Sequence, residues 1–554
     1  MMIPLERSKW MVLVATIWIQ AFTGTNFDFP SYSTQLKSVL EISQLQLNYL
    51  SMASDFGKLF GWCSGIFLLY FPTWIVLFMA AFLGLFGYGL QWLLIQRLVS
   101  FPYIMAFLLC LSSGCSITWF NTICFVLCIK NFPENWPLAV SLSVSFNGVT
   151  AALYNLIVTK ISSDAKNGSY LILNAFLPLI TSVAALIPIL QQPCSRKNLH
   201  VENAADKEDA YTFGFLYLLA AGTGLYLFFL DTTSQNIFIV ATLLLVLPMV
   251  WLKFRIFLFN EELRSEGHPV EGPSYSLVEI NNYEELSEES LSSISNQKSF
   301  GCRVFDKMIE KDRVTVIGEE HTVRMLVTRC DFWLYFVAYF CGGTIGLVYS
   351  NNLGQISQSR GYVSETRSLV TIYSTCSFFG RLISAGPDLV GGFYPSKTYT
   401  KRYTTTRTGW LALSLVPMPI AFLMLVLSGT ESALSTATGL IGISSGFVFS
   451  AAVSITSELF GSKSSGINHN ILITNIPLGS LLYGALGAVI YDNQIKSSAE
   501  VVVVGGSKVC MGRNCYNETF GWWGCVSLFG LAASFLLFLR TKGAYQRRHW
   551  ISRV

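Results

Sequence analysis

The chain has 554 residues, of which 52% are apolar or aromatic and only 13% are Asp, Glu, Lys or Arg. Soluble domains usually carry about 25% charged residues, so the composition excludes disordered, collagen-like and ordinary soluble proteins. The mean hydropathy is +0.49, and apolar runs of about 18 residues or more recur along the chain, which is the length of a membrane-spanning helix. Because the short alternation of a barrel is missing, we predict an all-α polytopic membrane protein.

The formal net charge of +4 averages two different regions. Residues 260–329 hold 14 of the 33 acidic residues, and the rest of the chain is sparsely charged. That segment is Ser-rich and too polar to fold alone, so a solvated linker is the favoured interpretation and regulation through its serines the alternative. No clustered basic face occurs, which argues against nucleic-acid partners and leaves the lipid bilayer as the expected surrounding.

Hydrophobic runs in chain order predict about fourteen membrane-spanning helices. The predicted spans are 9–29, 46–70, 73–96, 102–128, 135–160, 170–190, 212–231, 235–258, 331–350, 366–387, 408–429, 433–459, 467–491 and 519–539. The first run spans a whole bilayer and lacks a convincing cleavage site, so we expect a helix rather than a signal peptide. The expected domains are a six-helix bundle (1–200), an inserted helix pair (211–258), a cytoplasmic acidic loop (259–330) and a second six-helix bundle (331–542).

The distribution of Lys and Arg predicts that both termini are cytoplasmic, because the loops on that side collect more basic residues than the outer loops. The glycosylation sequons at Asn167 and Asn517 then fall outside. Cys510 and Cys515 also lie in an outer loop, where a disulfide and two free thiols are equally expected. Neither end carries a lipidation motif or an organelle address, so the sequence does not indicate which cellular membrane contains the protein.

Weak sequence matches relate the first six helices to the last six at nearly one offset. The matching pieces are Gly57-Lys58-Leu59 with Gly380-Arg381-Leu382, Ser112-Ser113-Gly114 with Ser444-Ser445-Gly446, and Asn147 with Asn475. Corresponding helices in two halves are typical of transporters built from repeats.

Small residues recur every fourth position in the same helices, which allows close helix packing. They are Gly57, Gly61 and Gly65 in the first half, and Gly380 with Ser384 and Gly442 with Gly446 in the second. Static bundles use such faces too, so packing is the favoured interpretation. Gly57, Gly61 and Gly380 are nevertheless candidate gating positions, together with Arg381 and Asp388.

Four charged residues fall inside the predicted spans: Asp28, Asp55, Lys58 and Arg381. Charges in membrane helices are costly and usually face a cavity or a partner. Asp55 and Lys58 are three residues apart, so they can pair on one helix face. For Asp55, a proton- or cation-linked site and a structural salt bridge are equally supported. Lys58 or Arg381 could attract an anionic solute, although a conformational lock is favoured for Arg381.

Amide side chains mark further candidate walls of a solute path, although hydrogen bonds between helices are their commoner role. With Asp28, Asp55 and Lys58, the candidate path residues are Asn26, Asn121, Asn147, Asn352 and Asn475. His469 is expected to be a satisfied polar helix end rather than a ligand.

Catalytic motifs are missing from the sequence. It contains no GxxxxGK[ST] phosphate-binding loop, no HExxH zinc motif and no GxSxG elbow, and its Cys and His residues do not follow zinc-site spacing. We therefore predict that the protein is not an enzyme and binds no cofactor or metal.

Several motifs resemble those of plant nodulin-like proteins of the major facilitator superfamily. They are 24–33 with 36–40, Trp119-Phe120-Asn121-Thr122 with Asn131-Phe132-Pro133, 350–356, and the loop from Cys510 to Cys515. The resemblance extends from about Ser8 to Lys542. It implies two six-helix bundles with a solute path between them, and transport by alternating access without ATP hydrolysis.

The superfamily's signature after the second helix of a half is a glycine, an acid and a basic cluster. The second half keeps it in Gly380, Arg381, Gly386, Asp388, Lys397 and Lys401. The first half lacks it, because its loop is the uncharged Tyr70-Phe71-Pro72-Thr73, so a charge latch is not expected there.

We therefore predict a secondary-active or facilitative transporter of a small polar or anionic solute, whose partners are that solute or ion and the bilayer. The alternative is a non-transporting membrane scaffold or receptor-like protein that acts through the 260–329 segment.

Overall fold

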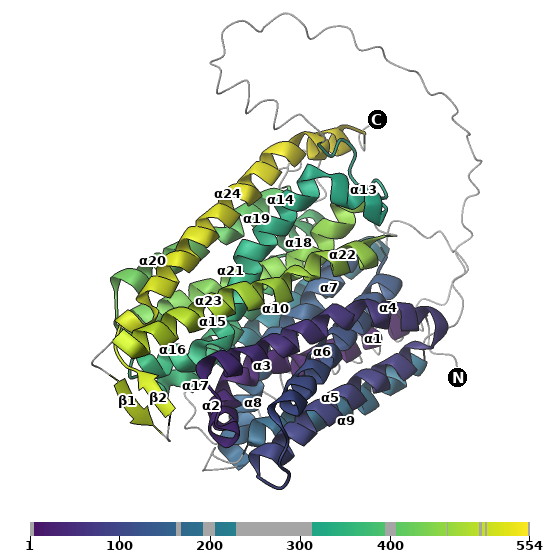
Figure 1. Cartoon of the computed structure of the whole chain (residues 1–554). Helices are drawn as coiled ribbons and strands as arrows, with labels where there is room; N and C mark the ends of the chain where they lie inside the picture. Colours follow the sequence, from purple (N-terminus) through teal and green to yellow (C-terminus); the bar gives the residue numbers. More distant parts are fainter. Residues whose placement is uncertain are drawn as a thin grey trace, which may run out of the picture.

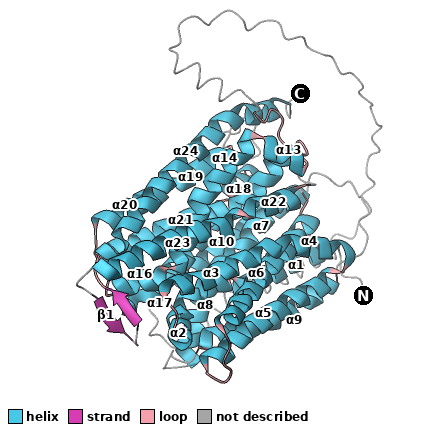
Figure 2. Ribbon diagram, viewed as in Figure 1, coloured by secondary structure: helices cyan, strands magenta, loops and turns pink. Residues whose placement is uncertain are grey.

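The computed structural model describes residues 5–133, 135–161, 168–191, 205–228, 313–393, 406–461, 464–497, 501–504 and 507–551. Almost all of these residues are helical (Figures 1 and 2), which confirms the predicted all-α class. A short antiparallel hairpin, β1 (Val501–Val504) and β2 (Ser507–Cys510), is an addition that the sequence did not suggest.

The first six crossings form the first half of the molecule, and three of them are broken by short 3-10 turns. The elements are α1 (Leu5–Thr23), η1 (Thr25–Asp28), α2 (Phe29–Leu40), α3 (Gln44–Gly57), η2 (Lys58–Phe60), α4 (Gly61–Tyr70), α5 (Thr73–Ile95), α6 (Tyr103–Asn131), α7 (Trp136–Ser145), η3 (Phe146–Val149), α8 (Thr150–Ile161) and α9 (Ser169–Leu190).

The second half contains six further crossings, preceded by the short helix α13 (Val323–Thr328). Its elements are α14 (Cys330–Tyr339), the π-turn η4 (Phe340–Thr344), α15 (Ile345–Asn351), α16 (Leu353–Ser359), η5 (Val363–Glu365), α17 (Thr366–Ile383), α18 (Gly386–Phe393), α19 (Arg407–Leu415), α20 (Pro417–Leu427), α21 (Glu431–Phe460), α22 (Ser465–Ile473), α23 (Asn475–Ser497) and α24 (Asn514–Ile551).

Ten helices in the described ranges are long and apolar enough to cross a membrane, so the predicted total of about fourteen is not confirmed. One helix of the predicted inserted pair is α10 (Ala205–Phe228). The other, predicted at 235–258, lies outside the described residues, as does most of the predicted acidic loop.

The first crossing departs from the prediction that it ends at residue 29. It breaks at Gly24 and continues as α2 to Leu40. A Cβ on Gly24 would lie 2.2 Å from the Asn147 carbonyl oxygen, so the break sits where the first crossing passes close to the fifth. Pro30 lies in the first turn of α2. Proline is favoured at the start of a helix, so the sequence did not indicate that α2 continues the first crossing.

The two halves repeat one pattern of helix packing. α3 packs against α6 as α17 packs against α21, and α1 packs against α9 as α14 packs against α24. Likewise, α5 packs against α9 as α20 packs against α24. The weak sequence matches therefore correspond to equivalent positions in two copies of one helical arrangement.

The tightest repeated contact joins the second and fourth crossings of each half. A Cβ on Gly57 would lie 2.1 Å from the Leu111 carbonyl oxygen, and one on Gly114 would lie 1.7 Å from that of Ser54. In the second half, a Cβ on Gly380 would lie 2.1 Å from the Ile443 carbonyl oxygen. Each contact brings two backbones together where no side chain fits.

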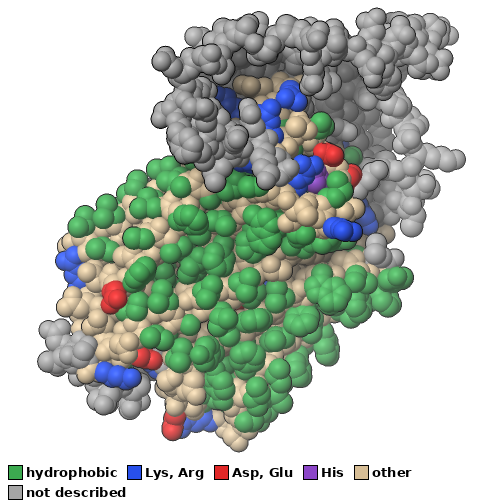
Figure 3. Space-filling view, turned by 45° about the horizontal axis from the view of Figure 1, so that its top comes forward, with side chains coloured by type: hydrophobic (Ala, Val, Ile, Leu, Met, Phe, Trp, Pro, Cys, Tyr) green, Lys and Arg blue, Asp and Glu red, His purple; other side chains and the backbone are tan. Residues whose placement is uncertain are grey.

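The outer surface is apolar over the length of the helices. Figure 3 shows hydrophobic side chains across this face, with Lys and Arg gathered mainly toward its ends. Exposed side chains such as Phe82, Ile187 and Leu427 belong to this surface. A contiguous apolar area of this extent is suited to lipid contact.

Two seams join the halves. In the first seam α3 and α4 pack against α23 and α22, and in the second α7, η3 and α8 pack against α17. α10 lies along the second seam against α7, α17 and α18. We call the end where α1 begins and α24 finishes the terminal end, and the opposite end, which carries β1 and β2, the hairpin end (Figure 1).

The glycine contact leads to a first prediction. Gly57→Ala should destabilise the protein by about 1–3 kcal/mol, because the added methyl group overlaps the α6 backbone. Gly65 in α4 is the matched control, since a Cβ there meets nothing within 4 Å, and Gly65→Ala should be neutral or slightly stabilising. Thermal unfolding of both detergent-solubilised variants measures the difference, and equal midpoints would contradict the packing account.

Candidate functional site

The first seam is centred on Asp55, which is 2% exposed. Its Oδ1 accepts a hydrogen bond from the Lys58 ammonium at 2.5 Å, one turn along the same crossing. Its Oδ2 accepts from the Ser480 hydroxyl on α23 and, at 3.5 Å, from the Asn351 amide on α15. The carboxylate therefore binds a cation of its own half and two neutral donors of the other half.

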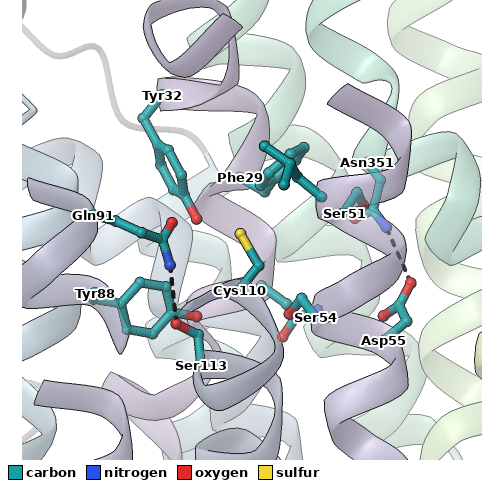
Figure 4. Close-up of a pocket in the computed structure, with 12 residues that line it drawn as sticks. Phe29, Tyr32, Ser51, Ser54, Asp55, Tyr88, Gln91, Cys110, Ser113 and Asn351 are labelled. Atoms are coloured by element: carbon teal, nitrogen blue, oxygen red, sulfur yellow. Dashed lines mark hydrogen bonds between the residues drawn. The ribbon is translucent and has the colours of Figure 1, made fainter. Parts of the chain in front are cut away.

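A small cavity lies beside Asp55 between the halves (Figure 4). Its volume is about 20 Å³, enough for about one water molecule. Most of its lining is polar or aromatic and comes from the first half, and Asn351 comes from the second. The lining includes Asn26, Tyr32, Ser54, Asp55, Tyr88, Gln91, Ser113 and Asn351. The Asn351 amide points across this space toward Asp55.

The second seam is centred on Arg381, which is 5% exposed. Its Nη1 donates to the Val144 carbonyl and to the Asn147 side-chain oxygen, both at 3.0 Å and both in the first half. The guanidinium also lies 5.4 Å from the ring centroid of Phe27, a distance at which a cation is attracted to an aromatic face. Among the described residues, no carboxylate forms an ion pair with Arg381.

Lys58 and Arg381 are equivalent positions in the two halves, but their neutralisation differs. Asp55 precedes Lys58 by three residues, and the residue that precedes Arg381 by three is Phe378. The duplicated cation is thus neutralised within its helix in the first half, and held by neutral oxygens and aromatic faces in the second. This asymmetry is the main electrostatic feature of the interface.

Side-chain hydrogen bonds join the two halves toward both ends of the interface. At the hairpin end, Asn48 donates to the Gly484 carbonyl at 3.2 Å in the first seam, and Asn155 donates to Thr371 at 2.8 Å in the second. At the terminal end, the Ser141 hydroxyl donates to the Arg381 carbonyl at 2.7 Å. The halves are therefore in contact at both ends, with the small cavity between them.

The other predicted path residues lie in different surroundings. Asn26 lines the cavity, and Asn121 is half-buried on α6. Asn147 bridges Arg381 to Gln20, to which its amide donates at 3.1 Å. Asn352 donates to Val348 of its own crossing, and Asn475 accepts from Thr344 within the second half. The structure thus brings Asn26 to the cavity and Asn147 to the second seam, whereas Asn352 and Asn475 bond inside the second half.

The predicted gating residues divide in the same way. Gly57 and Gly380 pack within their own halves, whereas a Cβ on Gly61 would meet Thr118 and, at 3.5 Å, Asn470 of the other half. Asp388 lies beyond α17 and pairs with Arg407 at 2.5 Å, and Arg407 also pairs with Glu458 at 2.9 Å. Burial raises the pKa of the Asp388 carboxyl above its ordinary value, and the Arg407 guanidinium opposes that rise.

The predicted outer-loop features lie at the hairpin end. Cys510 and Cys515 are joined by a disulfide between β2 and the start of α24. Asn517 is half-buried in the first turn of α24, and Asn167 lies outside the described residues.

Asn351, Ser480 and Gln20 were missing from the predicted site. Asn351 and Asn352 are adjacent, and the helix breaks between α15 and α16, so helical periodicity could not tell which amide faces the first half. Ser480 is one of many serines in the sequence, and only its position across the first seam from Asp55 distinguishes it. Gln20 carried a usable signal, because it is a buried amide in the middle of an apolar helix.

The ion pair in the first seam allows a double-mutant test. Asp55→Asn and Lys58→Met should each cost about 3–5 kcal/mol of stability, because each leaves one buried charge uncompensated. The double variant should recover most of that loss, since both charges are removed together. Unfolding of the wild type, the two single variants and the double variant gives the coupling free energy between Asp55 and Lys58. Strictly additive losses of stability would show that the two charges do not stabilise each other.

The comparisons with known proteins agree with the fold. The Nodulin-like family profile matches residues 9–257, and the profile described as "NFD4, C-terminal domain" matches residues 314–546. The chain is 49% identical over 553 residues to Protein NUCLEAR FUSION DEFECTIVE 4 of Arabidopsis thaliana, which covers 97% of this chain and 90% of that protein. It is 25% identical to the Probable transporter MCH1 of Yarrowia lipolytica, over 43% of this chain and 51% of that protein.

Among solved structures, the chain is similar to a bacterial homologue of the human lysosomal transporter Spinster in an inward-facing and unoccupied conformation. The TM-score is 0.52 at 12% identity, over 98% of each chain, so the similarity concerns the fold alone. The fold is of the major facilitator type, and with two family profiles and a 49% identical relative spanning nearly its whole length, the chain belongs to the nodulin-like family.

Proposed function

We propose that the protein is a secondary-active or facilitative transporter that moves a small polar or anionic solute between its two halves by alternating access. The observation that carries this function is Arg381, a buried cation at the interface that has no ion-pair partner among the described residues. The seam that it occupies separates two independently packed halves.

The relatives support transport rather than catalysis. MCH1 is named a probable transporter, and the bacterial protein with a similar fold is a homologue of the lysosomal transporter Spinster. In the part of the chain that the structure describes, no group of three or more His, Cys, Asp or Glu side chains could hold a metal ion.

The preference for an anion follows from the charge asymmetry of the seams. A buried guanidinium loses its hydration, and carbonyl and amide oxygens replace only part of it. An anionic group that reached Arg381 would form a charge-assisted, bidentate pair, which is stronger than the neutral bonds it replaces. Lys58 offers less attraction, because Asp55 already neutralises it.

The contacts that hold the seams favour alternating access. Each hydrogen bond between the halves contributes only about 0.5–1.5 kcal/mol net, because water replaces it when a seam opens. The closest glycine contacts, in which a Cβ would lie within about 2.1 Å of a carbonyl oxygen, lie inside each half. Across the second seam, a Cβ on Gly148 would lie 2.7 Å from the Phe378 backbone nitrogen, which is a looser contact. The halves can therefore separate at one end as rigid bodies while they stay in contact at the other.

We further propose that both termini are cytoplasmic and that the hairpin end faces the opposite side. The disulfide between Cys510 and Cys515 supports this orientation, because disulfides persist in oxidising compartments. In the same proposal, Asn26, Asp55, Lys58, Asn147 and Arg381 line the route of the solute.

A scaffold or receptor-like protein is the competing function, and reconstitution distinguishes the two. Purified protein in liposomes should take up one or more members of a panel of small anions, and neutral and cationic analogues should move less. Arg381→Gln should reduce anion uptake at least about tenfold, since truncating a buried hydrogen-bonded charge costs about 2–5 kcal/mol and each 1.4 kcal/mol is about tenfold.

Arg547→Gln is the matched control, because Arg547 is an exposed arginine on α24. It should leave uptake unchanged. If no solute in the panel moves, and the cellular role is lost on deletion of residues 260–312 but kept in Arg381→Gln, the scaffold function is correct.

A crosslink across the second seam tests alternating access directly. In Asn155→Cys/Thr371→Cys, the replaced side chains approach within 2.8 Å at the hairpin end, so oxidation should join the halves and stop uptake. Uptake should return on mild reduction, and each single variant should be insensitive to the oxidant. Full uptake by the crosslinked double variant would contradict movement of the halves at this seam.

A further inference from the structure

Asp28 differs from every other acid that the structure describes within the bilayer. It lies at the junction of η1 and α2, in the middle of the first crossing, and it is 0% exposed. Neither of its carboxylate oxygens has a hydrogen-bond partner among the described residues, and its side chain does not cap α2. By contrast, Asp55 pairs with Lys58 and Asp331 pairs with Arg540.

The surroundings of Asp28 contain phenols rather than cations. Four tyrosines from different elements lie within electrostatic range of its carboxyl: Tyr32 of α2, Tyr88 of α5, Tyr154 of α8 and Tyr170 of α9. On α6, Cys110 lines the same cavity as Tyr32 and Tyr88. Arg367 of α17 lies within electrostatic range of Tyr170. On α17, Arg381 and Tyr373 face the preceding residue, Phe27.

Three of these phenols already have partners. Tyr88 bonds Thr25 at 2.7 Å, Tyr154 donates to the Phe22 carbonyl at 2.8 Å, and Tyr170 donates to Asn155 at 2.7 Å. Asn174, which is also fully buried, follows Tyr170 by one turn of α9, and both of its amide atoms lack partners. The first half thus contains a polar interior that its own hydrogen bonds do not satisfy.

An ionised carboxylate with neither cation nor donor is strongly unfavourable in such a place, and proteins neutralise the group instead. We propose that Asp28 is a proton-binding site inside the first half, and that its protonation is coupled to solute movement. The proton is the ligand that the site fits best, because four phenols and an amide provide too few anionic oxygens for a divalent ion.

The cavity beside Asp55 gives the proton a route. Asn26, Tyr32 and Tyr88 line that cavity, and Figure 4 shows the two tyrosines there. Both tyrosines also lie within electrostatic range of Asp28. In this proposal, a proton passes from a water molecule in the cavity by way of the Tyr32 and Tyr88 phenols to one carboxylate oxygen of Asp28, and hydroxide or a buffer base is left on the water side. No other bond is made or broken overall.

Coupling to a solute rests on the proposed function, whereas proton binding does not. If protonation of Asp28 favours one conformation of the first crossing, it also changes the surroundings of Arg381. The reason is that Phe27, the residue before Asp28, contacts the Arg381 guanidinium with the face of its ring. The proton site and the solute site would then be adjacent along one turn of helix, η1.

Labelling with dicyclohexylcarbodiimide tests the site in the unmodified protein. This apolar reagent reacts with protonated carboxyl groups in apolar surroundings, and peptide mapping locates the product. Asp28 should be labelled, and the label should fall roughly tenfold for each pH unit above its titration midpoint. Asp55 is the internal control and should stay unlabelled, because its carboxylate is already paired with the Lys58 ammonium.

Three results would overturn the assignment. They are no label on Asp28 at mildly acidic pH, equal labelling of Asp28 and Asp55, and protection of Asp28 by sodium chloride but not choline chloride at constant pH. The last would show a metal cation in place of the proton. Labelling does not depend on transport, so it holds or fails separately from the proposed function.

The coupling has its own measurement. In liposomes that take up an anion, Asp28→Asn should abolish the proton flux that accompanies uptake and should keep exchange of the solute at equal concentrations. Equal proton flux in Asp28→Asn and wild type would overturn the coupling. A variant that does not fold is replaced by Asp28→Glu, which should restore proton flux with a shifted pH profile.

Discussion

Every charge buried within the bilayer needs a partner inside the protein, and the two halves meet this requirement differently. Lys58 has Asp55 one turn away, so the first half neutralises its own cation. At the equivalent place the second half has Phe378, so Arg381 is held by Val144 and Asn147 of the opposite half and by aromatic rings. The cation that its own half does not satisfy therefore lies at the interface, where, in the proposed mechanism, a solute reaches it when the halves separate.

Helix packing shows the same difference between contacts within a half and contacts between the halves. Backbones touch most closely within a half, at Gly57, Gly114, Gly380 and Gly446, where any side chain would overlap a carbonyl group. Between the halves, the contacts are mostly side-chain hydrogen bonds and ring packing, which water or a solute can replace. The close approach of Gly148 to the Phe378 backbone is an exception. α10 adds to the second seam from outside: Tyr217 bonds the first half at Leu138, and Gly224 lies against Phe378 of the second. A helix that touches both sides of one seam stabilises the closed arrangement there and leaves the other seam less supported.

Much of this could be predicted from sequence, because membrane helices must be long and apolar and buried charges are rare enough to notice. The membrane class and the four buried charges follow from that alone, and the relation between the halves follows from the sequence matches at nearly one offset. The direction of each side chain does not. Asn351 and Asn352 differ by one residue at a helix break, and only the fold determines that Asn351 reaches Asp55. The continuation of the first crossing to Leu40 was not predicted, because Pro30 interrupts the apolar run and is equally compatible with the start of a separate helix. The difference between Asp55 and Asp28 also depends on neighbours far away in the chain.

The central claim is that two rigid halves move about a closed interface, and distances between spin labels at both ends test it most directly. Ser38 and Glu431 are exposed at the hairpin end, one in each half, and Lys130 and Arg324 are exposed toward the terminal end. In lipid, over a pH series and with candidate anions, the two label distances should change in opposite directions, one pair moving apart as the other pair closes. If both distances stay fixed under every condition, or lengthen together, the halves do not alternate and the account is wrong.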